Sequence, residues 1–318
     1  MRDVCLFAHF DTDNRLDNYV LWYLEKLREL DFAIVFVSAS RLASADVVRL
    51  RTSCHDVILR ENAGLDFGSW CAGFAKHGSE ITGRLLLAND SIYGPVGDLK
   101  SALDRLTSKN ADFYGMVESL QIASHLQSWF LLFEPWVVRH QAFKRFWEQS
   151  FQAMSKKQII AQGEVGLSRR LVAEGFRYEA LYRPRHFYLA GHAFNPAHLL
   201  WRELLSAGGV PFVKIELLRS NPISLDDPAT ILKFVRSVDP SICPLIEAHL
   251  ARTVNDQEAR SIYRLYRRLV YQVIRRNYSL MSERRWAKAM WNTVKLELLM
   301  LPVWPWRLFK RLCLRQDI

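Results

Sequence analysis

The sequence has few of the features that mark secreted, zinc-binding or membrane-spanning proteins. Its 318 residues include five cysteines, which are scattered and never form a Cys-x-x-Cys pair. We therefore expect reduced thiols in a cytoplasm and no zinc-finger type of site. No apolar run approaches the ~20 residues that a membrane span needs. A strand-like segment, Val4 to Ala8, begins almost at once, so we expect no signal peptide.

Excess charge is absent from most of the chain, although the formal net charge is +10. From Glu258 to the end there are 14 Lys and Arg against 4 Asp and Glu, so residues 1–257 balance at 29 of each sign. An acidic partner would therefore be attracted to the C-terminal tail alone. No internal repeat or low-complexity linker is present, and with 50% hydrophobic residues the chain has a globular composition.

Short apolar runs alternate with helical patterns along the first half of the chain. Strands are expected at 4–8, 32–37, 56–59, 85–88, 112–117, 125–133 and 178–182. Helices are expected at 17–30, 44–50, 65–76, 98–106, 164–174 and 199–205. The β-α-β-α-β order at the start predicts an α/β protein with a parallel sheet and right-handed crossovers. We place this domain at residues 1–240 and a basic helical region at 241–318.

The run at 85–88 ends abruptly in Asn89-Asp90-Ser91, before a Gly94-Pro95 turn. In open α/β sheets, ligands bind outside the carboxyl ends of the strands. A carboxylate with short polar neighbours at that place is where a divalent cation holding a phosphate is expected. We therefore interpret Asp90 as the centre of a nucleotide-sugar site. The alternative is a turn without chemistry, since these residues favour turns for backbone reasons alone.

The basic tail combines aromatic and apolar residues with Lys and Arg. One helix face is predicted from Ile262 to Ile274, with arginines on the other faces. Beyond it, tryptophans and leucines alternate with basic residues up to Arg311. That composition is typical of a helix lying in a membrane interface, and we expect it to bind a membrane surface. The alternatives are a hairpin packed on the main domain or an oligomer contact. No nucleic-acid-binding motif accompanies the charge, so nucleic acid is not an expected partner.

Motifs in a fixed order give residues 3–225 a family resemblance. The motifs are Phe7-Ala8-His9-Phe10-Asp11, Asn62-x-Gly64-x-Asp66-x-Gly68-x-Trp70, Leu87-x-Asn89-Asp90-Ser91-x-Tyr93-Gly94-Pro95, His125-Leu126-Gln127-Ser128, Glu164-x-Gly166-Leu167-Ser168 and Pro211-Phe212-x-Lys214-x-Glu216-Leu217-Leu218-Arg219-x-Asn221-Pro222. On these motifs the chain resembles the rhamnan synthesis protein F family, glycosyltransferase-like proteins of bacterial rhamnose-containing polysaccharide assembly. More distantly it is similar to the GT-A glycosyltransferases that build O-antigen.

The resemblance implies a GT-A-like nucleotide-binding sheet and a set of site residues. Asn62 and Gly64 match the Asn-x-Gly segment after the third strand, and Glu164 matches the acidic residue that opens a later helix. The metal motif of those enzymes has two carboxylates, whereas Asp90 stands alone here. The implied cofactor is Mg²⁺ or Mn²⁺, held by Asp90 and relying on diphosphate oxygens and waters.

Transfer of a sugar from a nucleoside diphosphate requires stabilisation of the leaving diphosphate and a base for the acceptor hydroxyl. Asp90 would stabilise the leaving diphosphate through the metal. Glu164 would take the proton of the acceptor hydroxyl, or else only cap its helix. Residues expected at the donor are Asp11, Asn62, Gly64, Asp66, Asn89, Lys214 and Arg219. His125 and Gln127 are expected on the acceptor side. Two alternatives remain. Asp11 and Asp66 could be turn or capping residues, and Lys214, Glu216 and Arg219 could form structural salt bridges.

The sequence therefore predicts an inverting glycosyltransferase, with rhamnose as the sugar and dTDP-rhamnose as a candidate donor. It would act at the cytoplasmic face of a bacterial inner membrane, as a peripheral protein, on a lipid-linked or growing glycan. A different hexose donor is an alternative within the same fold. A non-enzymatic assembly or binding protein on a degenerate transferase fold is another, since only one carboxylate stands at the metal position.

Overall fold

The computed structural model describes residues 2–184, 194–222, 226–253, 271–272 and 275. Residues 1–184, 194–222 and 226–256 form one compact unit, and the remainder is assigned to a second. Every helix and strand described below belongs to the first unit. The tail pattern expected from Ile262 onward lies almost wholly outside the described residues. Within the described residues, no helix combines the length and apolar character that crossing a membrane requires.

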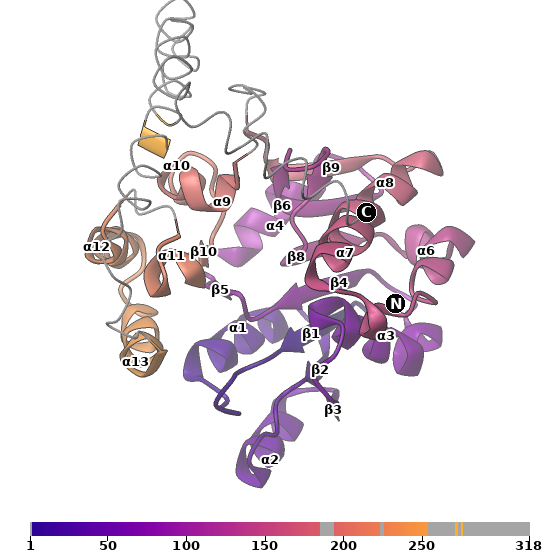
Figure 1. The fold of residues 1–318 in the computed structure, drawn as a ribbon, viewed down its shortest axis with the longest axis horizontal. Helices are drawn as coiled ribbons and strands as arrows, with labels where there is room; N and C mark the ends of the chain where they lie inside the picture. Colours follow the sequence, from indigo (N-terminus) through magenta and orange to yellow (C-terminus); the bar gives the residue numbers. More distant parts are fainter. Residues whose placement is uncertain (1, 185–193, 223–225, 254–270, 273–274, 276–318) are drawn as a thin grey trace, which may run out of the picture. The chain divides into compact units, whose positions relative to one another are not determined.

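An eight-stranded sheet forms the centre of the first unit (Figure 1). Its strands are β1 (Val4–His9), β2 (Ala33–Ser38), β3 (Asp56–Leu59), β4 (Leu85–Asn89), β6 (Phe113–Ser119), β7 (His125–Leu126), β8 (Phe130–Phe133) and β9 (Tyr178–Tyr182). Their order is β3-β2-β1-β4-β8-β6-β7, with β9 paired to β6. The strands β3, β2, β1 and β4 are parallel, so their carboxyl ends meet at one edge. A separate antiparallel pair joins β5 (Ile92–Tyr93) to β10 (Val213–Lys214).

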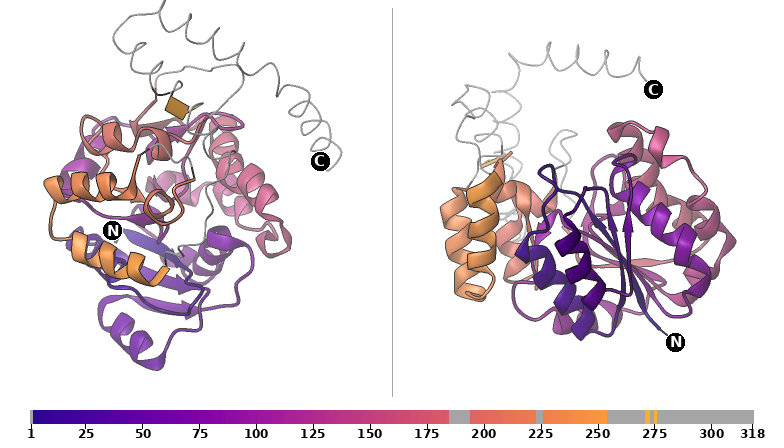
Figure 2. Two further views of the ribbon diagram at one scale, coloured as in Figure 1. Left: turned by 60° about the vertical axis from the view of Figure 1, so that its left-hand side comes forward. Right: turned by 90° about the horizontal axis from the view of Figure 1, so that it is seen from below.

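Helices lie on both faces of this sheet (Figure 2). On one face are α1 (Asn18–Glu29), α2 (Ser44–Ser53), α4 (Leu99–Thr107), α9 (Pro196–Leu199), α10 (Trp201–Leu205), α11 (Ile215–Arg219), α12 (Pro228–Val238) and α13 (Cys243–Thr253). On the other are α3 (Leu65–His77), α5 (Pro135–Arg139), α6 (Gln141–Phe146) and α8 (Val165–Ala173). The remaining helical segments are short: the 3-10 turns η1 (Gly78–Glu80) and η2 (Phe151–Ala153), the single turn α7 (Lys156–Gln158) and the π-helix η3 (Ile159–Glu164).

Two hydrophobic cores result from the alternation of side chains along the strands. In β1, Cys5 and Phe7 enter the core under α1, whereas Leu6 and Ala8 enter the core under α3. Strands buried on both faces read as continuous apolar runs, which is why these segments are recognisable in the sequence. The helix α4 shows the complementary pattern: Leu99, Ala102, Leu103 and Leu106 are its buried positions. Burial of these side chains is the main force that holds the layers together.

The α/β class predicted from the sequence is confirmed, with one difference in the sheet. The run expected as one strand at 125–133 forms two, β7 and β8, separated by Gln127, Ser128 and Trp129. Strand β8 runs antiparallel to β4 and to β6, so only part of the sheet is parallel. The apolar character of the run predicts burial, but it does not show that the pairing is interrupted: β7 and β8 both run antiparallel to β6, with a shift in register between them. The interruption places Gln127 and Ser128 at a cavity wall.

Candidate functional site

A polar cavity of about 390 Å³ lies at the carboxyl ends of the parallel strands. His9 and Asn89 reach it from the ends of β1 and β4, and Asp66 reaches it from the first turn of α3. The opposite walls carry Glu164 at the end of the π-helix and Lys214 at the end of β10. These segments are far apart in the sequence, and the sheet brings them together at the edge where α/β proteins bind ligands.

A chain of hydrogen bonds crosses this cavity from a cation to a carboxylate. The Lys214 Nζ donates to Ser91 Oγ at 3.0 Å, and Ser91 Oγ donates to Asn89 Oδ1 at 2.7 Å. Asn89 Nδ2 in turn donates to Asp66 Oδ2 at 2.7 Å. Each donor in such a chain polarises the next, and inside a protein the bonds are stronger than in water. A change in charge at Lys214 or Asp66 is therefore expected to affect the whole hydrogen-bonded chain.

Burial shifts the titration of both charged ends of this chain. It lowers the pKa of the Lys214 ammonium, although Glu164, Glu216, Asp66 and Asp90 all counteract the shift. Burial also raises the pKa of Asp66 from its usual value of 3.8 to about 6, despite Lys214 and the hydrogen bond from Asn89. The Lys214 ammonium donates a hydrogen bond to a neutral hydroxyl, that of Ser91, while the carboxylates act on it from further away. Such a group is suited to receive an anionic ligand.

Glu164 stands where a π-helix passes into an α-helix. Residues Ile159–Glu164 form the π-helix, and α8 follows directly. Its Oε1 accepts a hydrogen bond from the Ser128 backbone N–H at 3.1 Å and lies 3.8 Å from His125 Nε2. With 23% of its side chain exposed, the carboxylate lines the cavity and remains accessible. The extra residue of a π-turn re-aims side chains, which is a common arrangement at functional sites.

The wall beside Lys214 is built from amide and aromatic groups. Gln127 Nε2 donates to Asn195 Oδ1 at 2.8 Å, and Trp129 Nε1 donates to Gln127 Oε1 at 3.0 Å. The Lys214 ammonium lies 5.7 Å from the centre of the Trp129 ring. These contacts fix the rotamers of the wall, so that the cavity is preformed rather than assembled on binding. Gln127 thus lines the cavity, whereas His125 does not line it and lies beside Glu164, which does.

Asp90 is held beneath the cavity and is not among the residues that line it. Its Oδ2 accepts a hydrogen bond from the Phe10 N–H at 2.9 Å and lies 3.8 Å from His9 Nε2. Burial lowers the pKa of His9 to about 4, so this contact is not an ion pair at neutral pH. Burial, followed by the neighbouring charge of Asp66, raises the pKa of Asp90 well above its usual value. Asp66 and Asp90 therefore repel each other when both are ionised.

Asp11, which was predicted to contact the donor, forms an ion pair with Arg252, 241 positions later in the sequence. Arg252 Nη2 on α13 lies 2.5 Å from Asp11 Oδ2 and 2.5 Å from Asp17 Oδ2, and the guanidinium also pairs with Asp13. Burial alone would raise the pKa of Asp11, but the bonds from Arg252 and the Arg15 N–H outweigh it, and the pKa falls below its usual value. Arg252 thereby fastens the loop between β1 and α1, whose Phe10 lines the cavity.

Replacing Arg252 with alanine should destabilise the protein by about 3 kcal/mol, because three neighbouring carboxylates would lose their counter-charge. The side chains of Arg252, Asp11 and Asp17 are each less than a fifth exposed, so solvent screens them poorly. Urea unfolding measures the effect. The matched control is Arg236→Ala, which removes a pair with Glu247 that is about half exposed and should cost less than about 1 kcal/mol. Equal effects of the two changes would contradict this account.

The remaining predicted residues are placed as follows. Asn62 lines the cavity, and Gly64, with φ +80°, begins α3 without lining it. A Cβ at Gly64 would lie 2.9 Å from the Phe151 carbonyl carbon, so glycine is required there for two reasons. Arg219 is exposed and does not line the cavity. Glu216 does, and the neighbouring His198, whose Nε2 lies 3.4 Å from Glu216 Oε2, lowers its pKa to about 2.

Sequence reasoning missed several residues that shape the site. Ser91 was treated as part of a turn, yet it links Lys214 to Asn89. Asn195 and Lys156 line the cavity from segments without a motif. The signal for Asn195 was its position before Pro196, which is typical of a helix cap, and its side chain does cap α9 at 3.0 Å. No local pattern pointed to Arg252.

Two groups of three potential metal ligands occur among the described residues, and neither includes Asp90. One is Asp11, Asp17 and His249, where Arg252 already neutralises both carboxylates. The other, His55, His77 and Glu80, lies away from the cavity. Asp66 and Asp90 supply oxygen donors of the type that Mg²⁺ and Mn²⁺ prefer, and a cation between them would relieve their repulsion. These residues fit a hard divalent cation.

Comparisons with known proteins give relatives in sequence and in fold. The virulence protein VirA of Vibrio anguillarum is 29% identical over 254 residues, which cover 70% of this chain and 81% of VirA. The uncharacterized protein y4gN of Sinorhizobium fredii is 30% identical over 167 residues, 51% of this chain and 44% of that protein.

Among solved structures, one similar chain is described as a nucleotide-diphospho-sugar transferase from Desulfovibrio desulfuricans. The two chains are 12% identical with a TM-score of 0.37, and the match covers 75% of this chain and 99% of the other. A cytidylyltransferase from Leptospira borgpetersenii has a TM-score of 0.35 at 11% identity, covering 76% and 97%. Likeness at these TM-scores does not bear on substrate or reaction. The family described as rhamnan synthesis protein F matches residues 34–284, which is most of the chain. The protein belongs to the rhamnan synthesis protein F family.

Proposed function

We propose that the protein transfers a sugar from a nucleoside-diphosphate donor to a lipid-linked or growing cell-surface polysaccharide. The proposed sugar is rhamnose and the proposed outcome is inversion at the anomeric carbon. The observation that carries this proposal is the hydrogen-bonded chain Lys214–Ser91–Asn89–Asp66, which lines the same cavity as the Glu164 carboxylate. Family membership supports the link to rhamnose-containing polysaccharides.

The chain's own residues supply the two charges that the reaction needs. Lys214 would stabilise the negative charge that develops on the leaving diphosphate, and its low exposure makes that interaction stronger than in water. Glu164 would accept the proton of the attacking hydroxyl. Phe10 and Leu65 line the cavity although 42% and 43% exposed, and would offer apolar surface to a nucleobase or sugar ring. Fixed groups on several walls hold both reactants in position.

We propose Asp66 and Asp90 as the holders of a Mg²⁺ or Mn²⁺ ion. When bound, the ion would add positive charge where the diphosphate leaves. Asp66 presents its carboxylate to the cavity, and Asp90 lies behind it with one oxygen held by the Phe10 N–H. Arg219 has no part in this proposal, because it is exposed and does not line the cavity.

Membrane attachment through the basic tail is the second half of the proposal. A lipid-linked acceptor is presented at the membrane surface, and the Trp, Lys and Arg content of residues 282–318 is typical of an interfacial helix. Deleting the chain from Ser282 onward should therefore move the protein from the membrane fraction to the soluble fraction and leave donor binding unchanged. Centrifugation with vesicles of anionic and of neutral lipids measures this. A truncated chain that still sediments with anionic vesicles would refute the attachment.

A panel of nucleoside-diphosphate sugars tests the function directly. Thermal shift and calorimetry should show binding of one donor class, with about 2.7 kcal/mol of stabilisation at a hundredfold excess over the Kd. Mn²⁺ should strengthen that binding in the wild type and not in Asp90→Asn. The control is Asp112→Asn, which changes an aspartate beside β6 that does not line the cavity. A folded protein that binds no donor, with or without Mn²⁺, would overturn the proposal.

A non-catalytic assembly or binding protein is the second candidate. The observation that favours it is the position of Asp90, which stands alone in its motif and does not line the cavity. Such a protein would bind the donor or glycan in the same cavity. It would release no nucleoside diphosphate when supplied with donor and membrane extract. Product release under those conditions separates the two candidates.

A further inference from the structure

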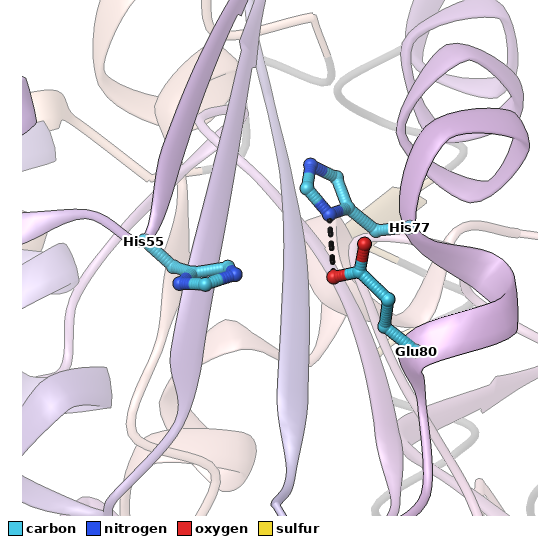
Figure 3. Close-up of side chains that lie close together, drawn as sticks. All are labelled: His55, His77 and Glu80. Atoms are coloured by element: carbon cyan, nitrogen blue, oxygen red, sulfur yellow. Dashed lines mark hydrogen bonds and ion pairs between the residues drawn. The ribbon is translucent and has the colours of Figure 1, made fainter.

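A cluster of histidine and carboxylate side chains lies at the edge of the sheet opposite the cavity. His55 directly precedes β3, His77 is the last residue of α3, and Glu80 ends the turn η1. Each offers one ligand atom, and these atoms all lie within 4.8 Å of one another. Figure 3 shows that the three side chains come from different segments and point toward one another. Cations are small enough to bridge three such atoms at once.

His77 is held by carboxylates on both of its ring nitrogens. Its Nε2 lies 2.7 Å from Asp56 Oδ2. Its Nδ1 lies 3.1 Å from Glu80 Oε2, the contact that is dashed in Figure 3. The side chain of His77 is 10% exposed, so the ring cannot turn freely into solvent. Both carboxylates are acceptors only, so each holds a proton on the ring nitrogen that it contacts. The contact with Glu80 is longer, and Glu80 is more exposed than Asp56, so Nδ1 is the nitrogen that can exchange its proton for a metal. A carboxylate behind a ligating histidine is the usual support of a metal site.

The surroundings of the cluster carry negative charge, of which Asp56 is already paired with Lys76 Nζ at 2.6 Å. The cluster lies at the C-terminal end of α3, where the helix dipole is negative. The exposed groups His55 and Glu80 leave an open side through which an ion and water can enter. Two imidazole nitrogens exclude Mg²⁺ and Ca²⁺ as preferred ions, since these take oxygen ligands, and they suit Zn²⁺ and its neighbours.

We propose that His55, His77 and Glu80 form a binding site for Zn²⁺ or a similar divalent transition metal. His77 Nδ1, one ring nitrogen of His55 and one oxygen of Glu80 are the ligands, with water in the fourth position of a tetrahedral ion. On binding, the proton on His77 Nδ1 leaves and Nδ1 takes the metal, while Asp56 retains the proton on Nε2. The ion would tie the start of β3 to the end of α3, independently of the proposed sugar transfer.

Titration of tag-free, EDTA-treated protein with Co²⁺ and Zn²⁺ tests the site. We expect one equivalent of Co²⁺ to give the visible absorption of a tetrahedral ion, and Zn²⁺ to displace it and raise the Tm by several degrees. Mg²⁺ should do neither. His55→Ala and Glu80→Gln should each weaken the affinity at least about tenfold, and Asp56→Asn by about tenfold or more through loss of support for His77.

Both His55 and Glu80 are exposed, so their variants are expected to fold, which circular dichroism verifies. The matched control His140→Ala removes a histidine outside the cluster and should leave the Co²⁺ spectrum and affinity unchanged. The site would be overturned by no Co²⁺ binding in the wild type, by unchanged affinity in His55→Ala, or by a loss of binding in Asp17→Asn, which would assign the ion to the other group. A thiolate-to-cobalt band that persists in His55→Ala would assign it to cysteine and overturn it equally.

Discussion

Replacing Glu164 with glutamine should lower the turnover of the proposed transfer by about 10²–10⁴-fold, the usual contribution of a general base. Glutamine keeps the shape of the side chain and can still accept the hydrogen bond from the Ser128 N–H at the position of Oε1. It has no basic oxygen for the proton of the acceptor hydroxyl. Donor affinity and Tm should therefore change little, and the loss should appear in kcat.

The measurement is release of nucleoside diphosphate with the donor that the panel identifies, in parallel with calorimetric donor binding. Glu174→Gln is the matched control, because that glutamate follows the same helix, α8, at its other end and is exposed. It should retain full turnover. Wild-type kcat in Glu164→Gln would remove this carboxylate from the chemistry. Asp66 would then be the next candidate base, since it also lines the cavity.

Asp66→Asn should have two opposite effects: a more stable protein and a loss of donor binding. The pKa of Asp66 rises from 3.8 to about 6 on folding, chiefly through burial. The ionised carboxylate is therefore less stable in the folded protein than in the unfolded chain. One pKa unit corresponds to about 1.36 kcal/mol, so ionised Asp66 lowers the free energy of unfolding by about 3 kcal/mol above pH 6. Asparagine carries no charge and so removes this cost, and its side-chain oxygen can still accept the hydrogen bond from Asn89. The favourable charge interaction with Lys214 is lost, which offsets part of the gain. A net gain of roughly 1–2 kcal/mol at pH 7.5 is expected on this basis.

The sign of the pH dependence checks the same point. As the pH falls from 6 to 4, wild-type Asp66 binds a proton in the folded state before it does so in the unfolded state, so this group adds stability as the pH falls. The contribution should be missing from Asp66→Asn, which urea unfolding across that range would show. Asp46→Asn, in the first turn of α2, is the matched control and should not alter the profile. A destabilised Asp66→Asn protein at pH 7.5 would contradict the assigned cost.

Local sequence signals were sufficient for most of the sheet and part of the site. Residues 4–8 and 85–88 were recognisable as strands because burial on both faces makes them uniformly apolar. Parallel neighbours end at the same edge, which is where the structure places Asp66 and Asn89, 2.7 Å apart. The position of Lys214 came from the family resemblance, because nothing in the spacing of Lys214, Glu216 and Arg219 shows which of them turns inward.

Long-range pairing accounts for what the sequence did not show. Arg252 and Asp11 are 241 positions apart, and no periodicity relates a helix near the end of the compact unit to a loop near its start. Asp17 stands at the N-cap position of α1, yet its side chain makes no capping bond and binds Arg252 instead. The π-helix before Glu164 escaped notice for a different reason: its inserted residue leaves the composition of a helix unchanged.

The small β5–β10 pair determines when the site can exist during synthesis. Lys214 meets Ser91 across 123 positions of sequence, and it arrives on a strand that is added after the main sheet is complete. A nascent chain that has emerged only as far as β9 already holds all eight strands of that sheet, but not the cation of the cavity. The cavity therefore gains its cation only when β10 has been synthesised, through a contact of high sequence separation.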